Sequence, residues 1–142
     1  MIAIFGAIFF LLFRFITYET NDASELLNQV KIGSATKRWQ SAYELSKVLN
    51  NPETIPEDVS FKNQMISAYN HSINDDALVR AYLAIAMGAT GDKFYAEELV
   101  NGLNDESRES RLAAIQAVGM VRSELAVMQL IDVINNSDYQ DE

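Results

Sequence analysis

From about residue 25 onward, apolar and polar positions follow one another with the spacing of amphipathic helices. In residues 77–89 and 108–120, apolar or small side chains recur every three or four positions, which predicts one helix in each range. The same spacing predicts helices over residues 95–103 and 125–134. A glycine and a short turn separate the first helix of each pair from the second. The pattern therefore predicts antiparallel helix pairs.

The two helix pairs are copies of one unit, because the chain matches itself at an offset of 31 residues without a gap. We call positions that match at this offset a column. Small residues in the first helices allow neighbouring helices to approach closely, and larger aliphatic residues fill the remaining space. The matching positions are Arg80 and Arg111, Ala86 and Ala117, Gly88 and Gly119, Leu99 and Leu130, Val100 and Ile131, and Leu103 and Ile134.

An earlier, less regular copy precedes these two. Residues 37–49 fit the first-helix pattern, with Arg38 in the arginine column, and residues 60–73 supply a second helix. An insertion at 50–58 contains two prolines, which prevent one continuous helix. Residues 24–34 predict a lone second helix that caps the N-terminal end. Since one helix pair cannot bury its apolar face alone, we expect these units to stack into a single domain over residues 25–137.

The segment VRAYLAIAMGATGD, residues 79–92, resembles a HEAT-like repeat of the short kind that is also found in phycobilisome bilin lyases. The resemblance covers residues 75–135 well and 25–73 loosely. It implies an all-α fold, a short α-solenoid of about three helix pairs. It also implies a function in binding other proteins rather than in catalysis. The same resemblance allows an alternative function, that of a lyase-like or chaperone-like protein that acts on a chromophore or on a partner protein.

The resemblance also implies a ladder of hydrogen bonds between repeats, in which an Asp lies six residues before each Arg of the arginine column. Asp105 fits Arg111 in this way. Asn74 stands six residues before Arg80, and Ile32 six residues before Arg38. We therefore expect an incomplete ladder.

Residues 1–17 differ from the rest of the chain, because residues 2–13 contain no charge. As a helix, residues 1–17 would extend about 25 Å, which is just sufficient for a bilayer core of about 30 Å when Arg14 reaches the headgroups. We therefore expect a single transmembrane anchor, joined to the repeats by a linker over residues 18–24. The predicted anchor residues are Ile2, Phe5, Phe9, Phe10, Leu11, Leu12 and Phe13.

Two other interpretations of the N-terminal segment remain open. It could be a cleaved signal peptide of an exported soluble repeat protein, although no basic residue precedes it and no Ala-x-Ala site follows. It could also be a buried core helix, although its apolar residues cover every face. With Arg14 as the only basic residue before Lys31, the flanking charges weakly favour a single-pass membrane protein whose soluble domain lies outside the cytoplasm.

Composition narrows the possible functions further. The formal net charge is −9, whereas nucleic-acid binding needs clustered basic residues. The chain has no cysteine, which excludes disulfides, thiol chemistry and cysteine-based zinc sites. The sequence therefore predicts no nucleic-acid partner and no cofactor or metal. Residues 138–142 form an acidic tail.

Few residues suggest chemistry, and each has a structural explanation. Gly88-x-x-Gly91-Asp92 lacks the strand and the Lys-Ser/Thr of a phosphate loop, so we expect Gly88 at a close helix contact and Gly91 at a turn with positive φ. His71 is the only histidine and has no cysteine or second histidine with which to bind zinc. We expect it near the end of a helix, where a cation is favourable.

Other charged and aromatic residues are likewise expected to be structural. The arginine column could bind anions, but a ladder between repeats explains it better. The acidic pairs Asp75–Asp76 and Asp105–Glu106 precede helix starts, where they can cap free N–H groups, and Glu97–Glu98 is expected to be solvated. Trp39, Tyr43 and Tyr69 are expected in the core. The sequence therefore shows no catalytic group.

The outer columns of the second helices are polar, rich in asparagine and mildly acidic. Asparagine is a middling helix former, so helix propensity does not favour its recurrence there. We expect these columns to face the concave side of the stack and to bind a protein segment, with an ordinary solvated surface as the alternative. The function that follows is a membrane-anchored scaffold or an accessory subunit of a larger membrane complex. The predicted protein-binding residues, which we call the polar stripe, are Asn63, Ser67, Asn70, Glu97, Asn101, Asn104, Met128, Asp132 and Asn135.

Overall fold

The computed structural model describes residues 6, 8–9 and 22–136 of the chain. Within residues 22–136 every regular element is a helix, which confirms the predicted all-α class. The α-helices are α2 (Ala23–Ile32), α3 (Ala35–Val48), α4 (Val59–His71), α5 (Ala77–Ala89), α6 (Ala96–Asn101), α7 (Arg108–Val121) and α8 (Glu124–Asn136). Four 3₁₀ turns lie between them, η1 (Pro52–Thr54), η2 (Ser72–Asn74), η3 (Lys93–Tyr95) and η4 (Gly102–Asn104).

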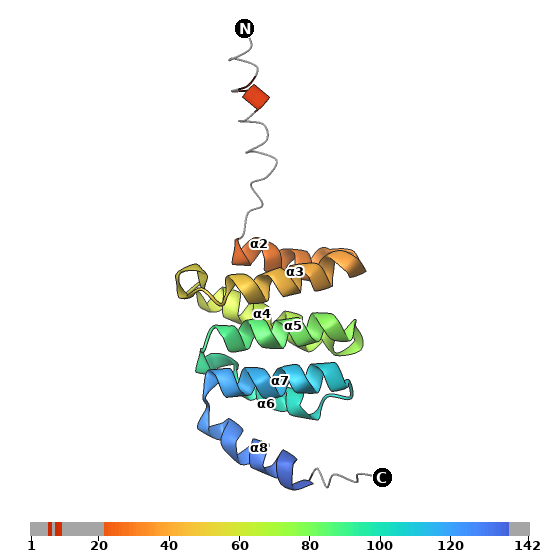
Figure 1. Ribbon diagram of the computed structural model, residues 1–142, viewed down its shortest axis with the longest axis vertical. Coiled ribbons are helices and arrows are strands. Elements are labelled where there is room, and N and C mark those ends of the chain that lie inside the picture. The colour runs from red at the N-terminus through yellow and green to blue at the C-terminus, as the bar shows by residue number, and fades with distance from the viewer. Residues whose placement is uncertain (1–5, 7, 10–21, 137–142) are drawn as a thin grey trace.

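The helices form two layers that run the length of the domain (Figure 1). The first helices of the pairs, α3, α5 and α7, lie side by side in one layer. The second helices, α4, α6 and α8, lie in the other, and α2 packs on α3 and α4 at the N-terminal end. This arrangement is the predicted short solenoid of three helix pairs, with α2 as the additional second helix at its start.

Short polar residues begin most of the helices. Asp22, Ser34, Asp58, Asp76 and Ser107 each accept a hydrogen bond from a backbone N–H in the first turn of α2, α3, α4, α5 and α7. These caps satisfy donors that the helix itself leaves free. The predicted starts of the helices consequently agree with the observed ones to within two residues.

The predicted helix over residues 95–103 is shorter than expected. Only Ala96–Asn101 is α-helical, and the 3₁₀ turns η3 and η4 flank it. Gly102 explains the tight second turn, because a Cβ there would collide with the buried Tyr69 hydroxyl and would lie 3.0 Å from the Cβ of Ala114. The backbone of this repeat is therefore drawn close to α4 and α7, at the expense of one α-helical turn.

Two glycines have the roles that the sequence predicts. A Cβ added to Gly88 in α5 would lie 2.7 Å from Cα and 2.8 Å from Cβ of Ala117 in α7, so the two first helices are in direct backbone contact. Gly91 adopts φ +65°, the left-handed conformation that glycine adopts most readily. In the next repeat the same column holds Arg122, which also has positive φ, at 51°.

The three aromatic residues predicted in the core have different environments. Tyr69 is fully buried, and Trp39 is half-buried against the core. The prediction for Tyr43 is wrong, because 41 % of this residue is exposed. Its ring makes an edge-to-face contact with Tyr82, with 5.2 Å between the ring centroids. Lys47 Nζ lies over the Tyr43 ring, 4.9 Å from its centroid.

The predicted anchor falls mainly on residues that the structure does not describe. Gly6, Ile8 and Phe9 are helical, and Phe9 is 71 % exposed. No helix among the described residues combines the length and the apolar character needed to cross a bilayer. The remaining anchor residues, which lie outside the described ranges, are Ile2, Phe5, Phe10, Leu11, Leu12 and Phe13.

Candidate protein-binding surface

The junction between the second and third repeats is built around a buried ion pair between Arg80 of α5 and Asp105. Arg80 Nε donates to one carboxylate oxygen of Asp105 at 2.5 Å, and the terminal NH2 group donates to the other at 2.9 Å. The two side chains are 7 % and 6 % exposed. This two-pronged geometry satisfies both carboxylate oxygens, as a buried charge pair requires.

Tyr69 of α4 completes this junction. Its backbone carbonyl accepts a hydrogen bond from the other terminal nitrogen of Arg80 at 2.5 Å, and the guanidinium carbon lies 3.9 Å from the ring centroid. The Tyr69 hydroxyl is buried against Gly102 and has no hydrogen-bond partner among the described residues. Burial raises the pKa of this hydroxyl to about 12. Arg80 is therefore held from both sides, by Asp105 of the next repeat and by Tyr69 of the preceding one.

The same contact recurs one repeat earlier, which corrects the prediction of an incomplete ladder. Arg38 of α3 forms an ion pair with Asp75, and its Nε donates to the Val30 carbonyl at 2.7 Å. Asp75 takes the place expected for position 74. It directly follows η2 just as Asp105 directly follows η4, but the link from this residue to the next first helix is one residue shorter before α5 than before α7. This pair is more exposed than the Arg80 pair, with side chains 24 % and 27 % accessible.

Arg111, the last residue of the arginine column, makes no ion pair with a described residue. Its guanidinium donates to the carbonyls of Asp105 and Glu106 in its own turn, at 2.7 and 2.8 Å. The ladder is thus formed by Arg38 and Arg80, each with the acidic residue of the following repeat. The arginines are structural at the two described junctions, and they are not an anion-binding ridge.

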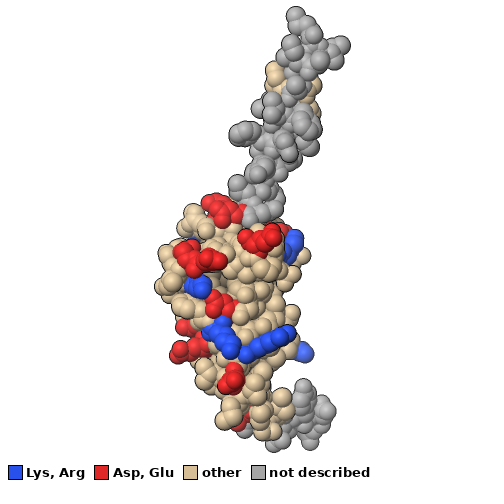
Figure 2. Space-filling view, turned by 90° about the vertical axis from the view of Figure 1, so that its left-hand side faces the viewer, with Lys and Arg blue, Asp and Glu red and all other residues tan. Residues whose placement is uncertain are grey.

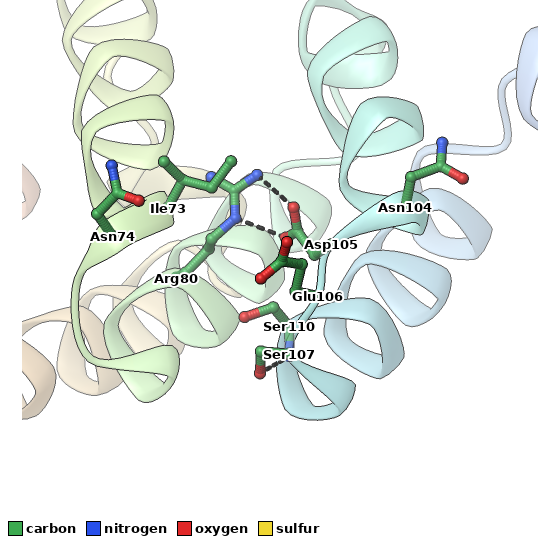
Figure 3. Close-up of a pocket in the computed structure, with 8 residues that line it drawn as sticks. All are labelled: Ile73, Asn74, Arg80, Asn104, Asp105, Glu106, Ser107 and Ser110. Atoms are coloured by element: carbon green, nitrogen blue, oxygen red, sulfur yellow. Dashed lines mark hydrogen bonds and ion pairs between the residues drawn. The ribbon is translucent and has the colours of Figure 1, made fainter.

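A groove of about 340 Å³ opens at the Arg80–Asp105 pair (Figure 3). Ile73 and Asn74 line one side of it, and Asn104 and Glu106 line the other, with the ion pair between them. Ser107 and Ser110 complete the lining. Apart from Ile73, the lining consists of hydrogen-bonding groups, so the groove is suited to bind a polar segment of a protein.

A second groove of about 380 Å³ occupies the equivalent place at the Arg38 junction. It is lined by Val30, Lys31, Arg38, Ser67, Ala68 and His71. His71 Nδ1 lies 2.8 Å from the Ser67 carbonyl oxygen, and Lys31 Nζ donates to Gln64 at 3.2 Å. Three basic side chains therefore meet at this groove, in a chain whose net charge is −9.

The structure places the whole polar stripe at the surface of the second-helix layer. All nine residues are exposed. Asn63, Ser67 and Asn70 lie on α4, Glu97 and Asn101 lie on α6, and Asn104 lies on η4. Met128, Asp132 and Asn135 lie on α8. Because α4 and α8 flank α6 within the layer, these columns form one surface. Ser67 and Asn104 each reach one of the two grooves.

The other candidate groups are explained by local structure. Asp92 begins η3 and binds Lys62 of α4 at 2.5 Å, so residues 88–92 are the end of α5 and the turn that follows it, and not a phosphate loop. Although burial opposes its charge, hydrogen bonds from Lys62 and the Phe94 N–H lower the pKa of Asp92. His71 is the last residue of α4, as expected. In the part of the chain that the structure describes, no three His, Cys, Asp or Glu residues come close enough to hold a metal ion.

The predicted roles of the acidic pairs are confirmed only in part. Asp76 caps α5 by accepting from the Leu78 N–H at 2.9 Å. Asp105 does not cap α7, because it binds Arg80, and Ser107 caps that helix. Asp75 likewise binds Arg38. Sequence reasoning missed both pairings, although the family pattern of an acidic residue before each arginine was the signal for Asp105.

Comparison with known protein families matches residues 67–142 to HEAT repeats. The match begins within α4 and includes α5 through α8, so it contains the Arg80–Asp105 junction and most of the polar stripe. Searches of curated proteins and of solved structures found no match.

Proposed function

The chain belongs to the HEAT-repeat family, and from this premise we propose that it is a protein-interaction scaffold that binds a partner through the polar stripe. HEAT repeats commonly mediate protein–protein interaction, and proteins built from them are typically non-enzymatic. The finer proposal is that residues 1–17 hold this scaffold at a membrane, where it serves as an accessory subunit of a larger complex.

The observation that supports the polar stripe most strongly is that its residues are exposed on the second helix of each of the three pairs. A solvated surface without a partner does not need the same side-chain type in successive repeats, and asparagine does not favour a helix. Asn63, Asn70 and Asn101 lie in α-helices and Asn104 ends η4, so each offers an amide that can donate to and accept from a peptide backbone. The two grooves adjoin this surface, so the surface is not flat.

The proposal of a membrane anchor is supported by the sequence of residues 2–13, which is uncharged and rich in Phe, Ile and Leu. The intact mass of the mature protein tests it directly. A full-length chain that stays with the membrane fraction after an alkaline wash supports the anchor. Loss of about the first 17–24 residues would instead support export of a soluble repeat protein.

The binding proposal is tested by comparing two arginine variants of the full chain in mild-detergent extracts of its own cells. Asn101→Arg places a large cation in the polar stripe, whereas Gln40→Arg places one at an exposed position of α3, in the other layer. We expect Asn101→Arg to lose the proteins that the unmodified chain retains, and Gln40→Arg to keep them. Both variants should melt within about 1–2 °C of the unmodified chain, because both sites are exposed.

Equal retention by the two variants would contradict the proposed surface. Loss of retention by both would also contradict it, since the layer that carries Gln40 would then take part in binding.

A further inference from the structure

The same columns that are buried in the second repeat are exposed in the third. Ala96 and Val100 of α6 are 5 % and 6 % exposed, whereas their counterparts Val127 and Ile131 of α8 are 56 % and 50 % exposed. In the first-helix layer, Ala81 of α5 is 9 % exposed and its counterpart Leu112 of α7 is 56 % exposed. In the second repeat these positions contact the repeat that follows. In the third repeat they form a surface that we call the open end.

The open end is as apolar as a junction between two repeats. All three columns hold a larger apolar side chain here than in the buried repeat, Val127 for Ala96, Ile131 for Val100 and Leu112 for Ala81. A repeat face that only meets solvent is expected to be polar. The space around the matching glycines also differs between the two repeats. A Cβ added to Gly119 meets no atom within 4 Å, whereas its counterpart Gly88 is in contact with Ala117. The open end therefore has the composition of an interface.

The N-terminal end of the solenoid does not match this surface. The positions of α3 that correspond to the inner face of α7 hold Lys37, Gln40 and Glu44 instead of Ser110, Ala113 and Ala117. Lys37 and Gln40 are exposed, and Glu44 is half-buried. An open end that stacked on the N-terminal end of another chain would cover these polar groups without partners, which is costly. Head-to-tail stacking is therefore disfavoured.

One pair of opposite charges at the open end is placed so that the surface can complement itself. On α7 and the turn that follows it, the exposed charges are Arg108, Glu109 and Arg122, and on α8 they are Glu124 and Asp132. A two-fold axis that lies between the two helices would place α7 of one chain over α8 of the other, so that Arg122 of one chain would face Glu124 of the other. On the side of the molecule that Figure 2 shows, few charges lie at this end of the domain.

We propose that the open end binds a second copy of this chain through the same surface, in a two-fold symmetric, tail-to-tail dimer. Closed two-fold dimers are the commonest assemblies of identical chains, and they need one surface that matches itself. The proposal goes beyond the scaffold function, because it adds a second interface on α7 and the apolar columns of α8. Two polar stripes would then be carried by one dimer.

A thiol placed at the open end tests the dimer in the full chain. The chain contains no cysteine, so a single introduced cysteine reports on one position alone. Because α8 of one chain lies over α7 of the other, the two copies of Ile131 are separated by about 8–10 Å, the spacing of packed helices. We expect Ile131→Cys, treated with a thiol-to-thiol cross-linker that spans this distance, to give mainly cross-linked dimer. Gln40→Cys, at the exposed N-terminal end, serves as the control and should remain monomeric. Absence of cross-linking at Ile131, or cross-linking only in a mixture of the two variants, would overturn the proposal.

A second measurement shows whether the apolar columns hold the dimer together. In sedimentation of the full chain in density-matched detergent, we expect Ile131→Glu to weaken self-association by at least about tenfold in Kd. Val59→Glu changes a similarly exposed aliphatic residue, at 60 %, on α4 and should leave the Kd unchanged. Equal Kd values for both variants, or a monomeric unmodified chain, would overturn the proposal. Neither result depends on Asn101, so the dimer and the polar stripe can fail independently.

Discussion

The junction between α5 and α7 and the open end beyond α7 and α8 are made from the same columns but differ in their contacts. At the junction Arg80 reaches Asp105 of the next repeat, and Gly88 touches Ala117. At the open end Arg111 binds the carbonyls of its own turn, and Gly119 faces open space. A repeated residue therefore has a fixed place in its own helix pair, but its energetic role depends on whether a further repeat covers it.

The largest difference is expected at the ion pairs of the ladder. Asp105→Asn leaves Arg80 buried without its counter-charge, so we expect a loss of about 3–5 kcal/mol in the free energy of unfolding. Asp75→Asn acts on the more exposed Arg38 pair and should cost no more than about 1 kcal/mol. Urea denaturation of both variants measures the difference. Similar losses would show that burial does not distinguish the two junctions.

The two matching glycines give the next largest effect, and with opposite signs. Gly88→Ala forces α5 and α7 apart, because the new methyl group would meet the backbone of Ala117, and should destabilise by about 1–3 kcal/mol. Gly119→Ala adds a methyl group in open space within a helix and should stabilise by about 0.5–1 kcal/mol. The melting temperatures of the two variants, each made in the Ile131→Glu chain so that no second copy covers the open end, report these signs. A lower melting temperature for Gly119→Ala would indicate that the open end is covered in the folded chain.

At the centre of the junction, the Tyr69 hydroxyl is expected to cost stability. Tyr69→Phe removes a buried hydroxyl without a described partner, so we expect a gain of about 1 kcal/mol at pH 7. The pKa of Tyr69 is raised above that of a tyrosine in the unfolded chain, near 10, to about 12. The stability that is linked to this raised pKa is therefore fully present below pH 10, where the hydroxyl is protonated in both states, and it is lost as the pH rises to about 12.

The alkaline loss of stability should accordingly be smaller in Tyr69→Phe, when urea midpoints are compared between pH 9 and 12. It should not disappear, because burial also raises the pKa of Tyr95. A variant that is less stable than the unmodified chain at pH 7 would indicate that the hydroxyl has a partner.

The smallest effect is expected at the turns within the helix pairs. Gly91 and Arg122 occupy one column and share positive φ, but only glycine adopts it without strain. Arg122→Gly should therefore stabilise by about 0.5–1 kcal/mol, and Gly91→Ala should destabilise by about 1 kcal/mol. Chemical denaturation can resolve these differences. Equal and opposite shifts would locate the strain in the backbone and exclude a role for the Arg122 side chain in stability.

The sequence predicted the helices and their order well, because the 31-residue offset specifies which residues share a face. It also predicted the contact at Gly88 and the positive φ at Gly91, since only glycine suits both. The pairing of Arg38 with Asp75 was not predicted, because the link between Asp75 and α5 is one residue shorter than the link between Asp105 and α7, and a match at a constant offset of 31 does not show this. The exposure of Tyr43 was missed for a similar reason, since the less regular first repeat does not specify which neighbours cover it.

The candidate surface was predictable only as a set of columns. Periodicity showed that the polar stripe residues share a face, and the structure places all nine at the surface. The groove at Arg80 depends on the 3₁₀ turns η2 and η4 and on Asp105 of the ladder, which lies outside the helices. The open end could not be read from the repeat pattern, because a column is equally apolar whether or not a following repeat covers it.

Native-state hydrogen exchange, measured helix by helix on the Ile131→Glu chain, tests most directly whether stability is concentrated at the covered junction. In this variant self-association at the open end is removed, so each amide reports on the single chain. We predict that the amides of α5 exchange only through global unfolding, whereas those of α8 exchange on the order of a hundredfold faster through local opening. Equal protection of α5 and α8 would contradict the account.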